Sequence, residues 1–547
     1  MKNIKNKILS PIVISIILGA SVVWMGGILW EKFNGARPQT DFVYSDTPFG
    51  DYLAMRHATW VDDYESVIKF SEKLQNITEK SVANDVAISK FLSGTFDDSA
   101  KSLSGDVSVA GRATYISYLL TKDDWRGIYK IVGNEKSLIL SPLRIWSSVG
   151  IKKESYALKY IETMPVSDSW KLFARGMIYA ETGRAAKAKV QFDKVPLDFF
   201  NLNDYLYLMS FYTQNNFQDA ADDLRRDFTN TPGGAFLANY NDAGTGDYFG
   251  KKKALAFSII QNISHSPLMS RTGAGLLLLR LADATYSANS DALNYYTGSY
   301  FYTSGATDYR PYFDKISRTS PYYPFVQLKY AEAEQNGHAK IRKIKKLLDK
   351  SPMFMPALSR LVDTDLQLGQ GRDALKALNN TLGAGAIPNK IRAYLLQQRA
   401  RIYTHTGDFN AAESDLLKAG DLMPEDIGIM LDIAHLWVSS SKKLDNAYSY
   451  AMVAIKENPS DVAAWDTMAM ATWKREGVMA ASDILERVGA ITIGNSRIFQ
   501  HLGDVRMEYK NREGAISAYK KAIELSGDGL SCGLKCLDKK LRNAKKI

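Results

Sequence analysis

Four alanines in the C-terminal third of the 547-residue chain recur at an almost constant distance. Ala412, Ala447, Ala481 and Ala515 lie 35, 34 and 34 residues apart. Two helices can cross closely only where a side chain is small, and larger side chains fill the space beside the crossing. The spacing therefore predicts a series of helical hairpins, with one of these alanines near the start of the second helix of each.

Other large, small and proline positions recur in phase with these alanines. They are Tyr403, Gly407, Asp408, Ala419 and Pro424, then Ala454 and Pro459, then Trp465, Met468, Ala469 and Leu485, then Phe499, Leu502, Gly503, Tyr519 and Ala522. The pattern resembles the tetratricopeptide repeat (TPR). This resemblance implies an all-α solenoid, a superhelix of stacked hairpins whose concave surface binds a protein or peptide.

The formal net charge of +10 suggests nucleic-acid binding until it is located along the chain. Residues 1–37 carry +4 and residues 530–547 carry +5, so everything between them carries only +1. A nearly neutral body does not favour nucleic acid as a partner. The basic C-terminal tail could contact anionic lipid beside a bilayer, but a solvated, frayed end is the simpler expectation.

An uninterrupted apolar segment runs from Ile8 to Trp30 without a charged residue. As a helix it would cross roughly 30 Å of hydrocarbon. A cleaved signal peptide is the alternative, but the apolar run is longer than such segments usually are. We therefore expect one transmembrane helix. Three lysines before it and two basic residues after it favour an inner-membrane protein whose bulk is periplasmic.

The rest of the chain divides by how clearly the repeat can be followed. The predicted domains are a basic N-terminus at 1–7, the transmembrane helix at 8–30, a tether at 31–48, degenerate TPR-like repeats at 49–228, an irregular aromatic-rich helical region at 229–324, C-terminal TPR repeats at 325–526 and a basic tail at 527–547. No stretch alternates as a strand does, so the body is predicted to be all helical.

The irregular region contains 11 aromatic residues between Tyr295 and Phe325. We expect these rings to pack between irregular helices. An exposed aromatic surface for a partner is the alternative, because Tyr is enriched where interfaces are strongest.

Motifs for catalysis or metal binding are missing. Residues 244–251 resemble a phosphate-binding loop, but Thr245 stands where that motif needs glycine. The six histidines include no metal-binding pair, and Cys532 and Cys536 are too few for a zinc site. We expect two free thiols, with a local disulfide as the alternative in an exported protein. No catalytic residue, cofactor, metal or small-molecule substrate is predicted.

In TPR proteins the first helix of each unit faces the concave groove. By this resemblance the candidate partner-binding residues are Tyr394, Gln397, Arg401, His405, Asp432, Asp466, Met470, Trp473, Asp504 and Met507, and the same mapping includes Lys474, Arg497, Gln500 and Glu508. Rings, methionines and single charges suit a peptide with apolar anchors. Ordinary solvated positions in a spacer are the alternative. The Lys and Asn pattern with which TPR chaperone adaptors hold a C-terminal carboxylate is missing.

Residues 427–519 are similar to the C-terminal repeats of bacterial envelope TPR proteins. The matching segments include 431–437, Asn458-Pro459 and 501–504, and residues 50–58 resemble the first repeat of alphaproteobacterial members. Some members of this group are adaptors that hold an envelope protease and its substrates together in cell-wall turnover. The resemblance implies a scaffold of this kind. A cytoplasmic-facing regulator of envelope-lipid synthesis, or an enzyme using the irregular region, are the alternatives.

Overall fold

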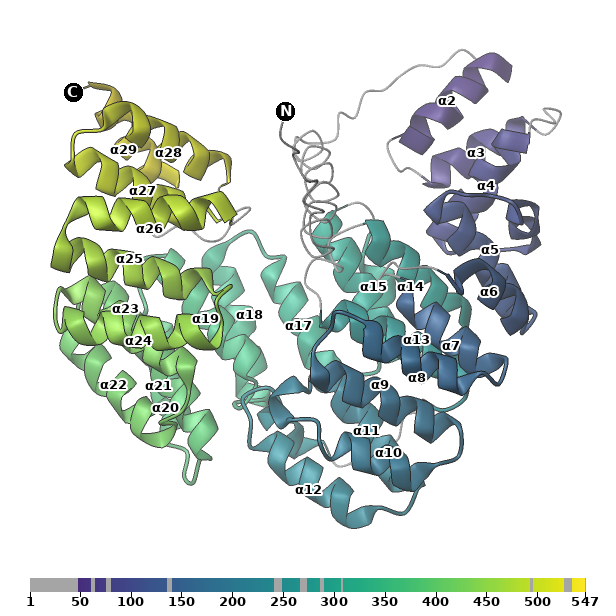
Figure 1. Ribbon diagram of the computed structural model, residues 1–547, viewed down its shortest axis with the longest axis horizontal. Helices are drawn as coiled ribbons and strands as arrows, with labels where there is room; N and C mark the ends of the chain where they lie inside the picture. The colour runs from purple at the N-terminus through teal and green to yellow at the C-terminus, as the bar shows by residue number, and fades with distance from the viewer. Residues whose placement is uncertain are drawn as a thin grey trace, which may run out of the picture. The chain divides into compact units, whose positions relative to one another are not determined.

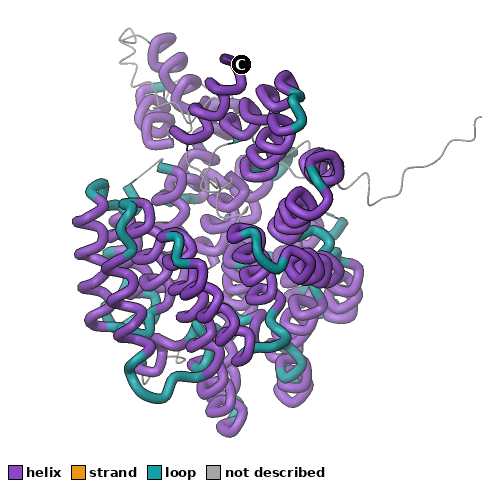
Figure 2. The backbone as a smooth tube through the Cα atoms, turned by 90° about the vertical axis from the view of Figure 1, so that its left-hand side faces the viewer, coloured by secondary structure: helices purple, strands orange, loops and turns teal. Residues whose placement is uncertain are grey.

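The computed structural model describes residues 48–60, 64–74, 80–134, 140–240, 248–265, 273–285, 290–305, 308–491, 495–525 and 534–546. Within these ranges the chain is helical and contains no strand (Figure 1, Figure 2). The predicted transmembrane segment at 8–30 lies outside them. None of the helices described is both long and apolar enough to cross a membrane.

The chain folds into two compact units. Of the described residues, those within 48–222 and 248–323 form the N-terminal unit, and those within 223–240 and 324–546 form the C-terminal unit. The chain therefore enters the C-terminal unit within α12, returns to the N-terminal unit, and leaves it again at α17.

The N-terminal unit is built from short helices joined by tight turns. They are α2 (Pro48–Trp60), α3 (Tyr64–Lys73), α4 (Lys80–Ser93), η1 (Asp98–Leu103), α5 (Val109–Thr121), α6 (Trp125–Val132), α7 (Ser141–Gly150), α8 (Glu154–Thr163), α9 (Asp168–Glu181), α10 (Ala185–Phe192), η2 (Leu197–Phe199), α11 (Leu202–Gln214), the start of α12 (Gln218–Thr229), α13 (Lys251–Ser264), α14 (Gly273–Thr285), α15 (Asp291–Ser304) and α16 (Arg310–Phe313).

The C-terminal unit is a more regular series of hairpins. After η3 (Ala235–Asn239) its helices are α17 (Tyr323–Glu332), α18 (Gly337–Lys350), α19 (Met355–Gln367), α20 (Arg372–Leu382), α21 (Asn389–Thr406), α22 (Phe409–Leu422), α23 (Ile427–Ser440), α24 (Leu444–Glu457), α25 (Val462–Glu476), α26 (Val478–Ile491), α27 (Ser496–Glu508), α28 (Arg512–Glu524) and α29 (Leu534–Lys546).

Polar caps begin several of these helices where the sequence places Ser, Asp or Asn. The Oδ1 atoms of Asp408 and Asp426 each accept a backbone N–H three residues on, at 3.1 Å. Such caps satisfy donors that have no partner inside the helix. Gly407 ends α21 with φ +83°, a left-handed conformation that favours glycine. Residues at the helix ends therefore determine where these helices begin and stop.

A small residue facing an aromatic ring holds the two helices of a hairpin together. A Cβ atom added to Gly503 of α27 would lie 2.4 Å from Cε1 of Tyr519 on α28. The same clash, also at 2.4 Å, would arise between Gly176 of α9 and Phe192 of α10. Each pair is separated by 16 residues, so both units use one crossing geometry. The four alanines that set the sequence period are fully buried, as predicted: Ala412, Ala447, Ala481 and Ala515.

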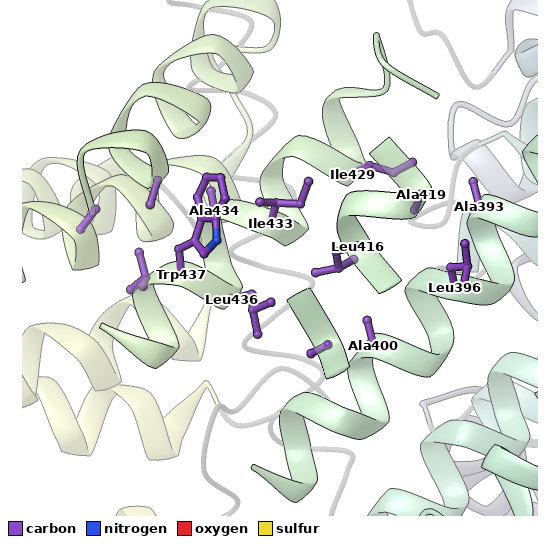
Figure 3. Packing of buried hydrophobic residues seen from close by; sticks show 14 residues of the cluster. Ala393, Leu396, Ala400, Leu416, Ala419, Ile429, Ile433, Ala434, Leu436 and Trp437 are labelled. Carbon is purple, nitrogen blue, oxygen red and sulfur yellow. The ribbon is translucent and has the colours of Figure 1, made fainter. Parts of the chain in front are cut away.

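The core of the C-terminal unit runs from hairpin to hairpin. Figure 3 shows one cluster in which Leu396 and Ala400 of α21, Leu416 of α22 and Ile433 of α23 point toward one another. Trp437 lies in the same cluster and is 4% exposed. Each hairpin therefore buries its apolar residues against the next one, as expected of a solenoid.

The first helices of the C-terminal hairpins form the more closely spaced layer. Consecutive members of the set α19, α21, α23, α25 and α27 touch one another, whereas consecutive second helices make fewer contacts with each other. The array must therefore curve toward its first helices. We call the solvent-facing side of these first helices the inner face.

In the N-terminal unit the chain covers the corresponding face itself. Helix α13 packs against α7, α9 and α11, and α14 packs against α4 and α5. Nine of the 14 residues of α13 are buried, on all sides of the helix. The segment that the sequence marked as irregular thus completes the core of this unit.

Polar groups fix α13 in place. The indole Nε1 of Trp146 donates to Oγ of Ser258 at 2.8 Å, and that of Trp170 donates to Oδ1 of Asn262 at 3.2 Å. Arg280 of α14 is 5% exposed and donates from Nε to the carbonyl oxygen of Leu92 at 2.8 Å. A buried polar group is costly unless it is bonded, so these pairs favour one position of α13 and α14.

The rings between Tyr295 and Phe325 pack inside their units, as expected. Tyr295 lies against Tyr322 with ring centroids 5.3 Å apart, and Phe301 stacks on Tyr312 at 5.3 Å. None of the 11 rings is exposed. Three of them are fully buried and eight are half-buried, which favours internal packing over an exposed aromatic surface.

The basic tail is not frayed along its whole length. Its residues 534–546 form α29, where Leu537 and Ala544 are buried against α28. Terminal repeats need such a helix because their last apolar face has no neighbour. Cys536 in α29 is disulfide-bonded, which contradicts the expectation of free thiols, and Cys532 lies outside the described residues.

We predict that Gly503→Ala destabilises the protein by about 1–3 kcal/mol, because its methyl group would overlap the Tyr519 ring. Gly420→Ala is the matched control, since its Cβ would meet nothing closer than 3.7 Å in a helix. That change should be neutral or slightly stabilising. Denaturant unfolding measures both. Equal effects of the two substitutions would contradict the crossing geometry.

We also predict a pH dependence from Glu181, which accepts the Gly250 N–H at the start of α13. Burial raises the pKa of this carboxyl to about 7, although Lys251 and Lys253 oppose the shift. The folded state then holds a proton that the unfolded state has lost. As the pH rises from about 4.5 to about 7, the free energy of unfolding should fall by at most about 3 kcal/mol. In Glu181→Gln this fall should disappear. If Glu181→Gln has the same pH profile of stability as the unmodified chain, Glu181 is not the source of this pH dependence.

Candidate functional site

All ten residues predicted to contact a partner lie on first helices of the C-terminal unit. Tyr394, Gln397, Arg401 and His405 are on α21, Asp432 is on α23, Asp466, Met470 and Trp473 are on α25, and Asp504 and Met507 are on α27. Helical spacing predicts that they lie on one side of the array, but it does not decide which of them remain available to a partner.

Side-chain hydrogen bonds join neighbouring first helices at a constant separation in sequence. Nε2 of Gln397 donates to Oδ2 of Asp432 at 2.8 Å, and Nε1 of Trp473 donates to Oε2 of Glu508 at 3.0 Å. Both pairs are 35 residues apart, one repeat. The inner face is therefore crossed by bonds that hold successive first helices in register.

At α21 the bonds reach back to α19. Nη2 of Arg401 donates to Oδ1 of Asp363 at 2.7 Å, and burial raises the pKa of the Tyr394 hydroxyl, which is hydrogen-bonded to Ser359. Asp432 is solvent-accessible, yet surrounding protein withdraws water from its carboxyl and raises its pKa. A side chain that is accessible but poorly hydrated is expected on a concave surface.

Two of the predicted partner-binding residues already form hydrogen bonds with other side chains of the protein. Asp466 is 3% exposed, and its Oδ1 lies 2.7 Å from Nδ1 of His501 on α27. Asp504 accepts hydrogen bonds from the Tyr519 hydroxyl at 2.8 Å and from Lys540 of α29 at 2.6 Å. The structure thus places both carboxyl groups in contacts that stabilise the repeat stack.

The two predicted methionines belong partly to the core. Met470 packs against the cluster that contains Trp437, and Met507 packs against the cluster of α28 and α29. Trp473 is half-buried against the α25–α27 cluster. His405 is exposed at the end of α21.

The same face also carries Arg497, which the mapping includes, and His435, which it does not. Arg497, on α27, has a buried Nε without a hydrogen-bond partner, and no carboxylate of the described residues forms an ion pair with it. His435 of α23 is exposed; loss of hydration and the Arg497 charge lower its pKa, against an opposing effect of Asp466. The spacing of Asp432, His435 and Ser439 along one helical stripe could have identified His435.

On the inner face, several carboxylates already have hydrogen-bond donors, whereas one guanidinium group has no carboxylate partner. Its carboxylates already accept hydrogen bonds: Asp363 from Arg401, Asp432 from Gln397, Glu508 from Trp473, and Asp504 from Lys540. Arg497 has no such partner in the described part of the chain. A ligand that completes this face would bring a carboxylate, because a guanidinium group binds carboxylates strongly.

A shallow pocket of about 640 Å³ opens elsewhere on the C-terminal unit, between α20, α21 and α22. It includes none of the ten predicted residues. Its Arg399 is already paired, with Nε and Nη2 each donating to Asp415 at 2.7 Å. Among the described residues, no group of three His, Cys, Asp or Glu side chains could hold a metal ion.

The comparison with family models identifies one repeat. The tetratricopeptide repeat model matches residues 496–528, which contain α27 and α28. With the hairpins around it, this match makes the described chain an all-helical, TPR-like solenoid. A comparison with curated proteins gives no match.

Several solved structures show a distant likeness. A tetratricopeptide repeat protein from Parabacteroides merdae ATCC 43184 is 15% identical, with 54% of this chain and 100% of that chain covered and a TM-score of 0.35. Yeast Tom70 is 12% identical, with coverages of 91% and 95% and a TM-score of 0.36. YrrB, a TPR protein with an unusual peptide-binding site, is 17% identical, with coverages of 37% and 98% and a TM-score of 0.25. These scores are too low to support an argument about ligands.

We predict that Asp466→Ala costs about 1–3 kcal/mol of stability, because the substitution removes the buried hydrogen bond between Asp466 and His501, which is 9% exposed. Gln397→Ala removes a bond of the same register between exposed side chains, and should cost less than about 1 kcal/mol. Denaturant unfolding of the two variants measures the difference. Equal losses would mean that Asp466 does not have this stabilising role.

Proposed function

We propose that this chain is a membrane-anchored TPR scaffold that binds an extended segment of a partner protein along the inner face of its C-terminal unit. The observation that carries the proposal is the inner face itself. First helices held in register present Trp473, His435 and Arg497 on one side, with Arg497 lacking an acidic partner in the described chain.

The positions of these groups define the partner segment. Trp473 contacts Glu508, which lies 11 residues beyond Arg497 on α27. That separation is roughly 16 Å along a helix, a distance that about five extended residues would span. The segment would place a carboxylate at Arg497 and His435 and an apolar side chain at Trp473. Aromatic and Arg residues often supply most of the affinity at such interfaces.

We place this scaffold in the bacterial envelope, with the predicted helix at 8–30 as its anchor and the repeats in the periplasm. The apolar N-terminal segment and the resemblance of residues 427–519 to envelope TPR proteins support this placement. The disulfide at Cys536 also supports it, because disulfides persist in oxidising compartments. Anchoring would raise the local concentration of a bound partner at the membrane, a role consistent with an adaptor in envelope proteolysis or cell-wall turnover.

A topology reporter tests the placement. A reporter that is active only outside the cytoplasm should be active when fused after Ile547. The control is the same fusion carrying a reporter that is active only inside the cytoplasm, which should be silent. The reverse result would favour a cytoplasmic regulator of envelope-lipid synthesis and would exclude the periplasmic scaffold.

Crosslinked capture from membrane fractions tests the inner face. A Trp473→Ala, Arg497→Ala double variant should recover several-fold less of the partner proteins than the unmodified chain, with unchanged helical content. Met452→Ala, Met479→Ala is the matched control, since these side chains are 43% and 64% exposed on second helices. The control should recover as much as the unmodified chain. If both variants recover as much partner as the unmodified chain, the partner does not bind at Trp473 and Arg497.

A further inference from the structure

Helix α18 is strongly basic. Residues 340–350 include six Lys and Arg residues and one acid, Asp349. Ile341, Ile344 and Leu348 are buried, so the basic side chains occupy the other sides of the helix. Arg342, Lys346 and Lys350 are all exposed and repeat every four residues, which makes one stripe about 12 Å long. We call these three residues the basic stripe.

The surroundings neutralise the basic stripe only in part, because Arg342 interacts electrostatically with Glu334 but forms no ion pair with it. The neighbouring Lys343 pairs with Glu334 at 2.9 Å, and Lys345 pairs with Asp373 at 2.6 Å. In the described part of the chain, Arg342, Lys346 and Lys350 form no ion pair. Like charges four residues apart destabilise a helix. An isolated fold gains nothing from this arrangement, whereas an anionic surface would stabilise it.

We propose that the basic stripe of α18 docks onto the phospholipid headgroups of an anionic bilayer. This inference rests on the membrane anchor of the proposed function. The basic stripe is exposed on the second helix of its hairpin. Its charge is complementary to an extended negative surface. Contact there would leave the first helices, and hence the inner face, free for a partner.

The magnitudes favour a bilayer over a soluble acidic partner. Each basic residue near an anionic membrane strengthens association by roughly fivefold, so three give roughly 100-fold. That is weak for a freely diffusing protein. A tether makes the same contact intramolecular, and a weak contact is then enough to orient the body. The contact should weaken as salt is raised.

Lysine acetylation of the full-length protein, reconstituted into vesicles, tests the proposal. One set of vesicles is phosphatidylcholine alone, and the other contains phosphatidylglycerol as well. At low salt, modification of Lys346 and Lys350 should fall several-fold in the anionic vesicles only, and high salt should restore it. Exposed Lys456 and Lys520, on α24 and α28, should be modified equally in both.

Two variants with the same change in net charge separate the basic stripe from general electrostatics. Lys343 adjoins Arg342 and should show the same lipid-dependent protection in the unmodified chain. In Arg342→Gln, Lys346→Gln, Lys350→Gln, Lys343 should lose this protection. In Lys418→Gln, Lys456→Gln, Lys520→Gln, which alters exposed lysines on three other helices, Lys343 should keep it. Equal protection in both variants would overturn the assignment to the basic stripe.

Flotation of the same samples keeps this proposal distinct from the anchor. A chain that floats with both vesicles, but whose Lys346 and Lys350 react equally in both, overturns docking and retains the anchor. Protection of these lysines in phosphatidylcholine alone also overturns docking, and points to a protein contact. A chain that floats only with anionic vesicles overturns the anchor and supports the basic stripe. A chain that floats with neither overturns both.

Discussion

The close crossing of two helices, made possible by one small residue opposite a ring, is the constraint on which the rest of this protein depends. Gly503 against Tyr519 and Gly176 against Phe192 set the same separation in both units. That separation allows a hairpin to bury its apolar residues against the next hairpin. It also brings consecutive first helices close enough for bonds one repeat apart, such as that between Trp473 and Glu508. The inner face is thus a product of hairpin packing.

Much of this fold could be predicted from the sequence, because repeat packing is a local property with a fixed period. The buried alanines, the hairpins and the packing of the rings between 295 and 325 all follow from it. The covering of the N-terminal repeats by α13 could not be predicted. It depends on contacts such as Trp146 with Ser258, 112 residues apart, which leave no periodic signal. The charge on α18 was also missed, since a net charge near zero over a long segment hides a positive helix.

For the candidate site, periodicity could indicate a face but could not show which groups remain available on it. Asp432 and Asp466 occupy comparable positions on consecutive first helices, yet one is accessible and the other is buried beside His501. The two carboxyl groups have different neighbours: Asp466 bonds to His501 of the next first helix, whereas Asp432 accepts a hydrogen bond from Gln397 of the preceding one. Arg497 lies at a mapped position, but only its neighbouring side chains reveal that it forms no ion pair among the described residues, and no motif records such a missing acid.

The covering of the N-terminal repeats by α13 and α14 has a consequence for how the chain is made. A simple solenoid can fold progressively as it is synthesised, because each repeat needs only its neighbour. Here the α4 region needs Arg280, which follows Leu92 by 188 residues, so the first repeats stay incomplete while most of their unit is still being translated. Contacts this distant slow folding and prolong the exposure of apolar surface. The first hairpins therefore keep apolar surface exposed until α13 and α14 have been synthesised and can cover it.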